Sequence, residues 1–213
     1  MKKFFQVLAL GVILGGTIMA SAVDAAAKIP PIALSSDQQQ AIRRINDYIN
    51  SFQSLKCNFS QVSAKGTLTN GVLYISKPGK LRFDYASPNP LLIISDGRWL
   101  TIKDRVRERG DQFPLSSTPL RLVVSPQVDL LAETNVVAFS SHDGLTSVSL
   151  QDRKDSLGGY ITLIFDEQLK QLSQWIVVDG KERRTTVQLS NIETGGKFDP
   201  KLFVGEISRE AKK

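Results

Sequence analysis

The chain has 213 residues and a formal net charge of +6, with 27 Lys and Arg against 21 Asp and Glu. The basic residues are spread along the sequence, whereas a nucleic-acid-binding protein concentrates them in one stripe, so nucleic acid is excluded as a partner. Cys57 is the only cysteine, so no disulfide can form within the chain and the fold must depend on its hydrophobic core.

Residues 1–27 have the features of a cleavable signal peptide. After a basic start, the uncharged run Phe4–Met19 leads to Ala20-Ser21-Ala22 and Ala25-Ala26-Ala27, which both fit the A-x-A rule of signal peptidase. The apolar run is shorter than the ~20 residues that a membrane span needs. No cysteine follows it, so the motif for lipid attachment is missing. We therefore expect cleavage after Ala22 or Ala27 and export of residues 28–213 as a single, untethered domain.

The segment after this leader predicts one amphipathic helix that ends near Ser54. Ser36 can open the helix, because Gln39 follows in the capping-box position. Such a helix is expected to pack one face on the core. Apolar residues recur at helical spacing, at Ile42, Ile45, Ile49 and Phe52.

From Leu55 onward the apolar pattern changes to a period of two, which is typical of β-strands. Asn70-Gly71 interrupts the second of these runs and indicates a turn or a bulge, and Pro78-Gly79 marks a turn. Strands separated by turns every eight to twelve residues or so predict one antiparallel meander that curls like a barrel. The predicted strands cover residues 55–61, 68–76, 81–85, 91–94, 98–104, 136–140, 145–151, 160–165, 172–178 and 184–192.

The middle of the chain breaks this rhythm. Phe113–Leu131 is strongly apolar but contains three prolines, so it cannot be a strand throughout. It predicts short helical pieces, with Ser117 or Thr118 as N-cap and Pro119 at the first helical position. A curved sheet leaves an apolar concave face, which such helices can cover. We therefore expect a mainly β (α+β) fold with a single curved antiparallel sheet, an N-terminal helix and a short helical lid that includes Pro119, Leu120, Leu122 and Val123.

The residues of a catalytic site are missing from the sequence. The single histidine, His142, sits in a His-Asp-Gly turn, and the sequence has no G-x-S-x-G elbow. Cys57 lies within a predicted strand on its apolar side, where a thiol is usually buried and inert. Neither a metal-ligating cluster nor a phosphate-binding glycine loop is visible. We expect no enzyme activity, no metal and no cofactor.

The predicted strands instead carry large apolar and aromatic side chains, which suits an apolar ligand. Because the side-chain period in a strand is two, alternation predicts which of them face the hollow of the curved sheet. The predicted lining residues are Cys57, Phe59, Leu81, Phe83, Tyr85, Leu100, Ile102, Trp175 and Val177.

A series of short motifs runs through residues 59–124. In order, they are Phe59-x-Gln61, Gly71-Val72-Leu73, the run from Lys77-Pro78-Gly79 to Phe83-Asp84-Tyr85, Pro88, Ile94-Ser95-Asp96-Gly97, Leu100 and Thr118-Pro119-Leu120. Residues 198–203 add a late element with an aromatic residue at each end. In their order and spacing, behind a signal peptide and a helix, these motifs resemble the LolA family of periplasmic outer-membrane lipoprotein carriers.

The resemblance implies an unclosed β-barrel in the periplasm, with short helices capping its hollow. It also implies a cargo: the acyl chains of lipoproteins, taken from an inner-membrane ABC transporter and passed to an outer-membrane receptor such as LolB. We expect the carrier to be a monomer. The alternative is a periplasmic protein of the same fold that binds or senses a lipid or glycolipid. An enzyme on a β scaffold is a third reading, which the missing catalytic set disfavours.

Members of the family often have an arginine at the position of Lys77, and this arginine holds the lid by hydrogen bonds to backbone carbonyls. Lysine keeps the charge but lacks the planar guanidinium group, so Arg82 is a second candidate for the role. The resemblance thus leads to the hypothesis that Lys77 or Arg82 latches the lid to carbonyls of residues 120–124.

Overall fold

The computed structural model describes residues 29–107, 109–153 and 159–205, so the predicted signal peptide lies outside the described residues. Most of this part of the chain forms β-strands joined by short turns. The strands are β1 (Ser54–Val62), β2 (Leu68–Ser76), β3 (Lys80–Tyr85), β4 (Leu91–Asp96), β5 (Trp99–Asp104), β6 (Arg109–Pro114), β7 (Thr134–His142), β8 (Leu145–Asp152), β9 (Tyr160–Asp166), β10 (Gln171–Val178) and β11 (Arg184–Thr194).

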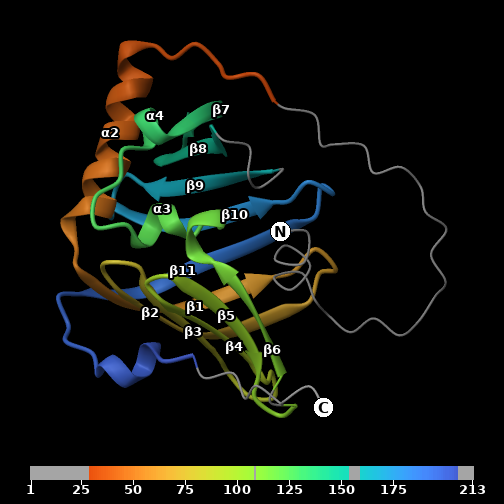
Figure 1. Cartoon of the computed structure of the whole chain (residues 1–213). Coiled ribbons are helices and arrows are strands. Elements are labelled where there is room, and N and C mark those ends of the chain that lie inside the picture. The colour runs from red at the N-terminus through yellow and green to blue at the C-terminus, as the bar shows by residue number, and fades with distance from the viewer. Residues whose placement is uncertain (1–28, 108, 154–158, 206–213) are drawn as a thin grey trace, which may run out of the picture.

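These strands form one 11-stranded sheet, in the order β6-β5-β4-β3-β2-β1-β11-β10-β9-β8-β7 (Figure 1). Every strand pair is antiparallel, and the two edge strands of the sheet are β6 and β7. The sheet curves around one hydrophobic core without closing into a full barrel. The predicted single antiparallel sheet forming an unclosed barrel is confirmed, because β6 and β7 are not paired with each other.

The period-two pattern of the sequence gives the sheet its two faces. In β3, buried residues alternate with partly exposed ones along the strand, and Leu81, Phe83 and Tyr85 are the buried set. Similar alternation in β1 buries Cys57, Phe59 and Gln61. The buried sets form the concave face, while most residues between them lie on the convex face.

Asn70 and Gly71 lie inside β2, so the prediction of a turn or bulge at this dipeptide is wrong. Gly71 is paired with Phe59 of β1 on one side and with Tyr85 of β3 on the other. A Cβ atom on Gly71 would lie 2.1 Å from the backbone oxygen of Asp84 and 2.8 Å from a ring carbon of Phe59. The glycine serves this close packing, which local turn chemistry does not reveal.

The amphipathic helix is α2 (Ser36–Ser51), which buries Ile42, Ile45 and Ile49 as predicted. Its start differs by one residue, because Ser35 and Gln38 form the capping box rather than Ser36 and Gln39. The sequence has two adjacent serines and three adjacent glutamines here, so the capping pattern fits both registers. The helix also ends at Ser51 rather than near Ser54. None of the described helices is long and apolar enough to cross a membrane.

The middle insertion connects the two edge strands and crosses the open side of the sheet (Figure 1). It contains the 3-10 turn η1 (Leu115–Ser117) and the short helices α3 (Arg121–Val124) and α4 (Leu130–Glu133). We call residues 115–133 the lid. Helical pieces in this region are confirmed, but the first residues of the predicted segment belong to β6, a strand that the sequence pattern did not predict.

The predicted cap of α3 is wrong. The helix begins at Arg121, two residues after Pro119, and its N-cap Leu120 makes no side-chain hydrogen bond. The hydroxyl of Thr118 donates to the carbonyl of Leu115 at 2.9 Å. It therefore completes the preceding 3-10 turn and is not available to cap α3.

Candidate functional site

The concave face of the sheet is lined by one hydrophobic cluster. All nine residues predicted to line the hollow are buried members of this cluster, namely Cys57, Phe59, Leu81, Phe83, Tyr85, Leu100, Ile102, Trp175 and Val177. The prediction missed other strand residues of the cluster, among them Leu73 and Ile75 of β2, Leu163 of β9 and Leu189 of β11. Each alternates along its strand, so the same period-two signal could have found them. Whether these side chains touch a ligand stays a prediction.

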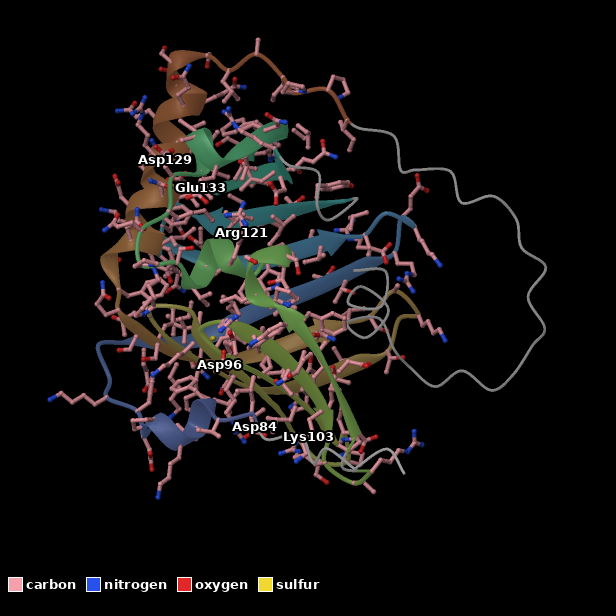
Figure 2. All side chains as sticks on the ribbon, viewed as in Figure 1. Asp84, Asp96, Lys103, Arg121, Asp129 and Glu133 are labelled. Atoms are coloured by element: carbon pink, nitrogen blue, oxygen red, sulfur yellow. The ribbon has the colours of Figure 1, made fainter. Side chains whose placement is uncertain are left out.

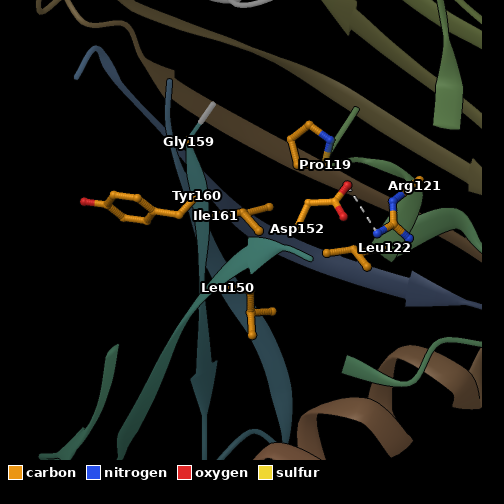
Figure 3. Close-up of a pocket in the computed structure, with 8 residues that line it drawn as sticks. All are labelled: Pro119, Arg121, Leu122, Leu150, Asp152, Gly159, Tyr160 and Ile161. Carbon is orange, nitrogen blue, oxygen red and sulfur yellow. Dashed lines mark ion pairs between the residues drawn. The ribbon is translucent and has the colours of Figure 1, made fainter. Parts of the chain in front are cut away.

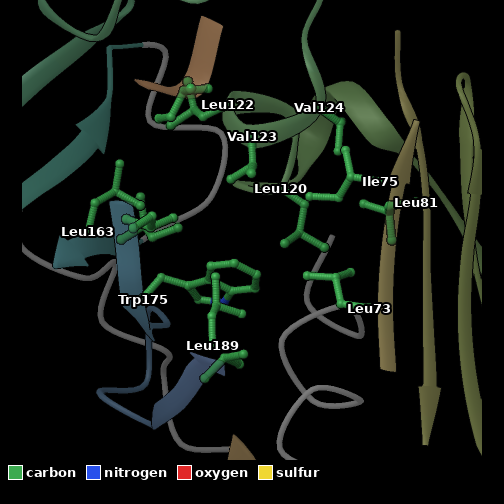
Figure 4. Packing of buried hydrophobic residues seen from close by; sticks show 14 of the residues in the cluster. Leu73, Ile75, Leu81, Leu120, Leu122, Val123, Val124, Leu163, Trp175 and Leu189 are labelled. Carbon is green, nitrogen blue, oxygen red and sulfur yellow. The ribbon is translucent and has the colours of Figure 1, made fainter. Parts of the chain in front are cut away.

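The lid fills the hollow. Leu120, Val123 and Val124 pack against side chains of the sheet, as Figure 4 shows. The space left between them has a volume of about 10 Å³, which is at most enough for one water molecule. Its sheet-side lining consists of Leu73, Ile75, Leu81, Phe83 and Trp175. The structure is therefore a closed form whose apolar interior is hidden from solvent.

The turn between β2 and β3 and two asparagine side chains of α2 hold the lid in place. The amide of Gly79, in the turn between β2 and β3, donates to the carbonyl of Val124 at 2.7 Å. Asn50 of α2 makes two hydrogen bonds of 2.9 Å with the backbone of Val128, one as donor and one as acceptor. Asn46 of the same helix accepts from the amide of Leu130 at 3.1 Å. The lid is thus fixed to a strand turn and to α2.

Arg121 joins α3 to α4 within the lid and the lid to β8 of the sheet. Its guanidinium lies 2.7 Å from a carboxylate oxygen of Glu133 in α4 and 3.7 Å from one of Asp152 at the end of β8 (Figures 2 and 3). A second small cavity lies beside this ion pair, lined partly by Pro119 and Leu122. Arg121 therefore closes the seam between α3 and β8.

Lys77 and Arg82 do not have the partners that the latch hypothesis gave them. The ammonium group of Lys77 donates to the carbonyl of Ile49 and lies 4.5 Å from the ring centroid of Phe52. It is thus a cation at the C-terminal end of α2, where the helix dipole favours positive charge. Arg82 binds the carboxylate of Asp84 and the carbonyl of Leu202.

The position of Arg82 follows from strand alternation. Leu81 and Phe83 face the hollow, so Arg82 between them must point to the convex face, away from the lid. The predicted contacts of Lys77 and Arg82 with carbonyls of residues 120–124 are therefore wrong. The lid is held there by the backbone amide of Gly79 instead.

Lys77 gives the fold a pH dependence, because burial lowers its pKa from 10.5 to about 8. Between these values the unfolded chain keeps a proton that the folded protein has released, so the free energy of unfolding rises with pH there. Below about pH 8 the folded protein bears the full cost of a buried ammonium group. Relative to Lys77→Met, we expect the free energy of unfolding of the parent to increase by on the order of 3 kcal/mol as the pH rises from about 8 to 10.5.

Urea unfolding of both proteins across this pH window measures the difference. Comparison with the Lys77→Met variant cancels other groups that titrate in the same range, Cys57 among them. A difference in free energy of unfolding that does not change with pH would contradict the prediction.

Cys57 and His142, which were considered as catalytic residues from the sequence, lie within β1 and at the end of β7. Burial raises the pKa of the Cys57 thiol to about 12, so the thiol stays protonated and unreactive in the closed form. His142 is 80% exposed in its turn, beside the carboxylate of Asp143. Among the described residues, no group of three His, Cys, Asp or Glu side chains is placed to hold a metal ion.

The chain is similar to one known protein family and to several of its members. The family described as outer membrane lipoprotein carrier protein LolA matches residues 50–205. The outer-membrane lipoprotein carrier protein of Pseudomonas aeruginosa is 25% identical over 183 residues, which cover 81% of this chain and 86% of the relative. The protein of the same name from Coxiella burnetii is 24% identical over 184 residues, covering 82% of this chain and 86% of the relative.

Among solved structures, a LolA superfamily protein from Nitrosomonas europaea aligns with a TM-score of 0.46 and 10% sequence identity, covering 79% of this chain and 97% of the other. The family match extends from the last turn of α2 through the whole sheet and the lid. The chain therefore belongs to the LolA family of outer-membrane lipoprotein carrier proteins.

Proposed function

We propose that this protein is a periplasmic carrier that binds the acyl chains of lipoproteins in the hollow of its sheet. It takes them from an inner-membrane ABC transporter and passes them, as a monomer and without enzymatic activity, to an outer-membrane receptor such as LolB. The observation that carries the proposal is the closed apolar interior under a lid. The nine predicted lining residues and the lid residues Pro119, Leu120, Leu122 and Val123 are the proposed contacts with cargo.

The closed form explains how such a carrier stays soluble when it is empty. Each CH₂ group of an acyl chain transferred out of water is worth ~0.8 kcal/mol, so a carrier must offer a comparable apolar area. The same area would cause aggregation if it were exposed. In the closed form Leu120, Val123 and Val124 occupy the hollow, so they take the place that acyl chains would fill. Loading must therefore displace the lid and replace one set of apolar contacts by another.

The two tryptophans provide a direct test, because Trp175 is 2% exposed in the hollow and Trp99 is 37% exposed on the surface. In the Trp99→Phe variant, Trp175 is the only tryptophan, so the tryptophan fluorescence comes from the hollow alone. A synthetic lipopeptide with brominated acyl chains is expected to quench Trp175, whereas the same peptide without acyl chains is not. The matched control is Trp175→Phe, in which Trp99 remains and its quenching should be small.

Three results would speak against the proposal. Quenching of Trp99 and Trp175 to the same extent would indicate surface adsorption rather than binding in the hollow. Loss of quenching in both proteins would indicate that no acyl chain is bound. Binding of free brominated lipid together with exclusion of the lipopeptide would favour a lipid-binding or lipid-sensing protein over a carrier.

A further inference from the structure

A line of aromatic rings runs through the interior and ends at polar groups. The ring centroids of Trp175 and Phe83 are 6.1 Å apart, those of Phe83 and Phe59 are 5.1 Å apart, and those of Phe59 and Tyr85 are 5.0 Å apart. The hydroxyl of Tyr85 then donates to the side-chain oxygen of Gln61 at 2.9 Å. Tyr85 is 2% exposed and Gln61 is 5% exposed. The apolar interior therefore becomes polar at this point while still buried.

A third polar group lies beside this pair. Thr69 of β2 is directly opposite Gln61 of β1 in the sheet register, and directly opposed residues project from the same face. The hydroxyl oxygen of Thr69 is buried and has no hydrogen-bond partner among the described residues. A buried hydroxyl without a partner is destabilising. Thr69 carries one of three buried side-chain polar atoms that lack a partner among the described residues, so its position requires an explanation.

The cluster lies at the end of the hollow that faces away from α2. The helix crosses the opposite end, where Tyr48 contacts Phe165, Arg44 pairs with Glu167 and the carbonyl of Ile49 accepts from Lys77. Gln61 and Thr69 instead adjoin the hairpin turn between β1 and β2. An acyl chain that lies along the aromatic line with its methyl end toward α2 would bring its carbonyl end to the cluster.

We propose that Gln61, Thr69 and Tyr85 form a polar subsite that binds the acyl carbonyl oxygens of the cargo lipid. A carbonyl oxygen only accepts hydrogen bonds, and the cluster supplies donors: the hydroxyl of Thr69 and the amide nitrogen of Gln61. Tyr85 positions Gln61 by donating to its oxygen, which directs the amide nitrogen to the ligand. The subsite would fix how deeply an ester- or amide-linked chain enters and would discriminate against chains without a carbonyl. The inference rests on the proposed function, because it concerns the same hollow.

The test uses two lipopeptides with the same peptide and the same chain length, one with ester-linked chains and one with ether-linked chains. Ether linkage removes the carbonyl oxygens and leaves the apolar area nearly unchanged. We expect the parent protein to bind the ester form about tenfold more tightly, which corresponds to roughly one to two hydrogen bonds. In Thr69→Val and Gln61→Leu, the ratio of the affinity for the ester form to that for the ether form should fall toward one. The affinity for the ether form itself should stay the same.

The matched control is Thr162→Val, which removes a strand hydroxyl from the convex face, where it contacts Ser149 at 2.8 Å. This variant should keep the full preference for the ester. Infrared spectra of the bound ester lipid with carbon-13 carbonyls give an independent readout. The carbonyl stretch should lie at lower frequency in the parent than in Thr69→Val, because hydrogen bonding weakens the C=O bond.

The outcomes separate the two proposals. Equal affinity of the parent for ester and ether forms, or an ester preference that survives in both variants, would overturn the polar subsite and leave the carrier proposal standing. An unshifted carbonyl stretch would overturn the subsite as well. Failure of both lipopeptides to bind the parent would overturn the carrier proposal together with the subsite.

Discussion

Replacing Gly71 with alanine is expected to lower the free energy of unfolding by at least ~3 kcal/mol, at the upper end of what overpacking costs. The added Cβ would lie 2.1 Å from the backbone oxygen of Asp84 and 2.8 Å from the ring of Phe59. The first of these atoms is backbone within a paired strand and cannot move without breaking the register of β2 and β3. The second belongs to a fully buried ring in contact with Phe83 and Tyr85.

Urea unfolding, followed by the fluorescence of the buried Trp175, measures this effect. Gly196→Ala is the control, because the nearest atom to a Cβ at that position is a ring carbon of Phe198 at 3.5 Å, which is ordinary contact. This variant should change the free energy of unfolding by no more than about 0.5 kcal/mol. Equal stability of the two variants would show that the sheet around Gly71 can yield, contrary to the prediction.

The same glycine shows where prediction from sequence stops. Asn70-Gly71 has the composition of a tight turn, and only the partners on β1 and β3 explain why the chain passes straight through it. Strands such as β3 and β9 were predictable because each carries a regular alternation that is decided within the strand. The edge strand β6 was not, since Arg109–Pro114 contains charges, a glycine and a proline, and becomes a strand by pairing with β5.

The candidate site also contains residues that a local pattern predicts and contacts that it does not. Alternation identified nine of the buried residues of the concave face, because burial on one face of a strand leaves a local pattern. The contacts that hold the lid were missed, since Asn50 meets Val128 across 78 positions of sequence and no pattern links them. Gln61 shared the alternation of Cys57 and Phe59, but its partner Tyr85 lies two strands away.

The other large expected effect concerns the lid, where Val123→Asp should release the closed form. Val123 is 3% exposed between the lid and the sheet, and a carboxylate there has no cationic partner in its cavity lining. Burying an unpaired charge costs several kcal/mol. The protein can avoid that cost by moving the lid outward, so the decrease in the free energy of unfolding cannot exceed the free energy of lid closure. We expect this decrease to be on the order of 3 kcal/mol, about the value of burying one to two apolar side chains.

Two measurements distinguish lid release from general unfolding. An apolar dye such as anilinonaphthalene sulfonate should bind Val123→Asp strongly and the parent weakly, because the hollow is exposed only in the variant. Amide hydrogen exchange should quicken in the lid but stay slow in the central strands β1 and β11, whose ladder does not depend on α3. Gln127→Asp, an exposed position of the same lid, should behave like the parent in both measurements.

Lid release also tests how a carrier balances loading against retention. If the lid residues take the place of acyl chains in the empty protein, Val123→Asp removes a competitor for the hollow and acyl chains should enter faster. The same carboxylate would then lie against bound chains or in water, where it cannot seal the hollow, so the bound lipopeptide should also leave faster. Both rates should therefore rise in Val123→Asp, measured by quenching of Trp175. A variant that loads faster but releases at the parent's rate would show that the lid guards only the empty hollow.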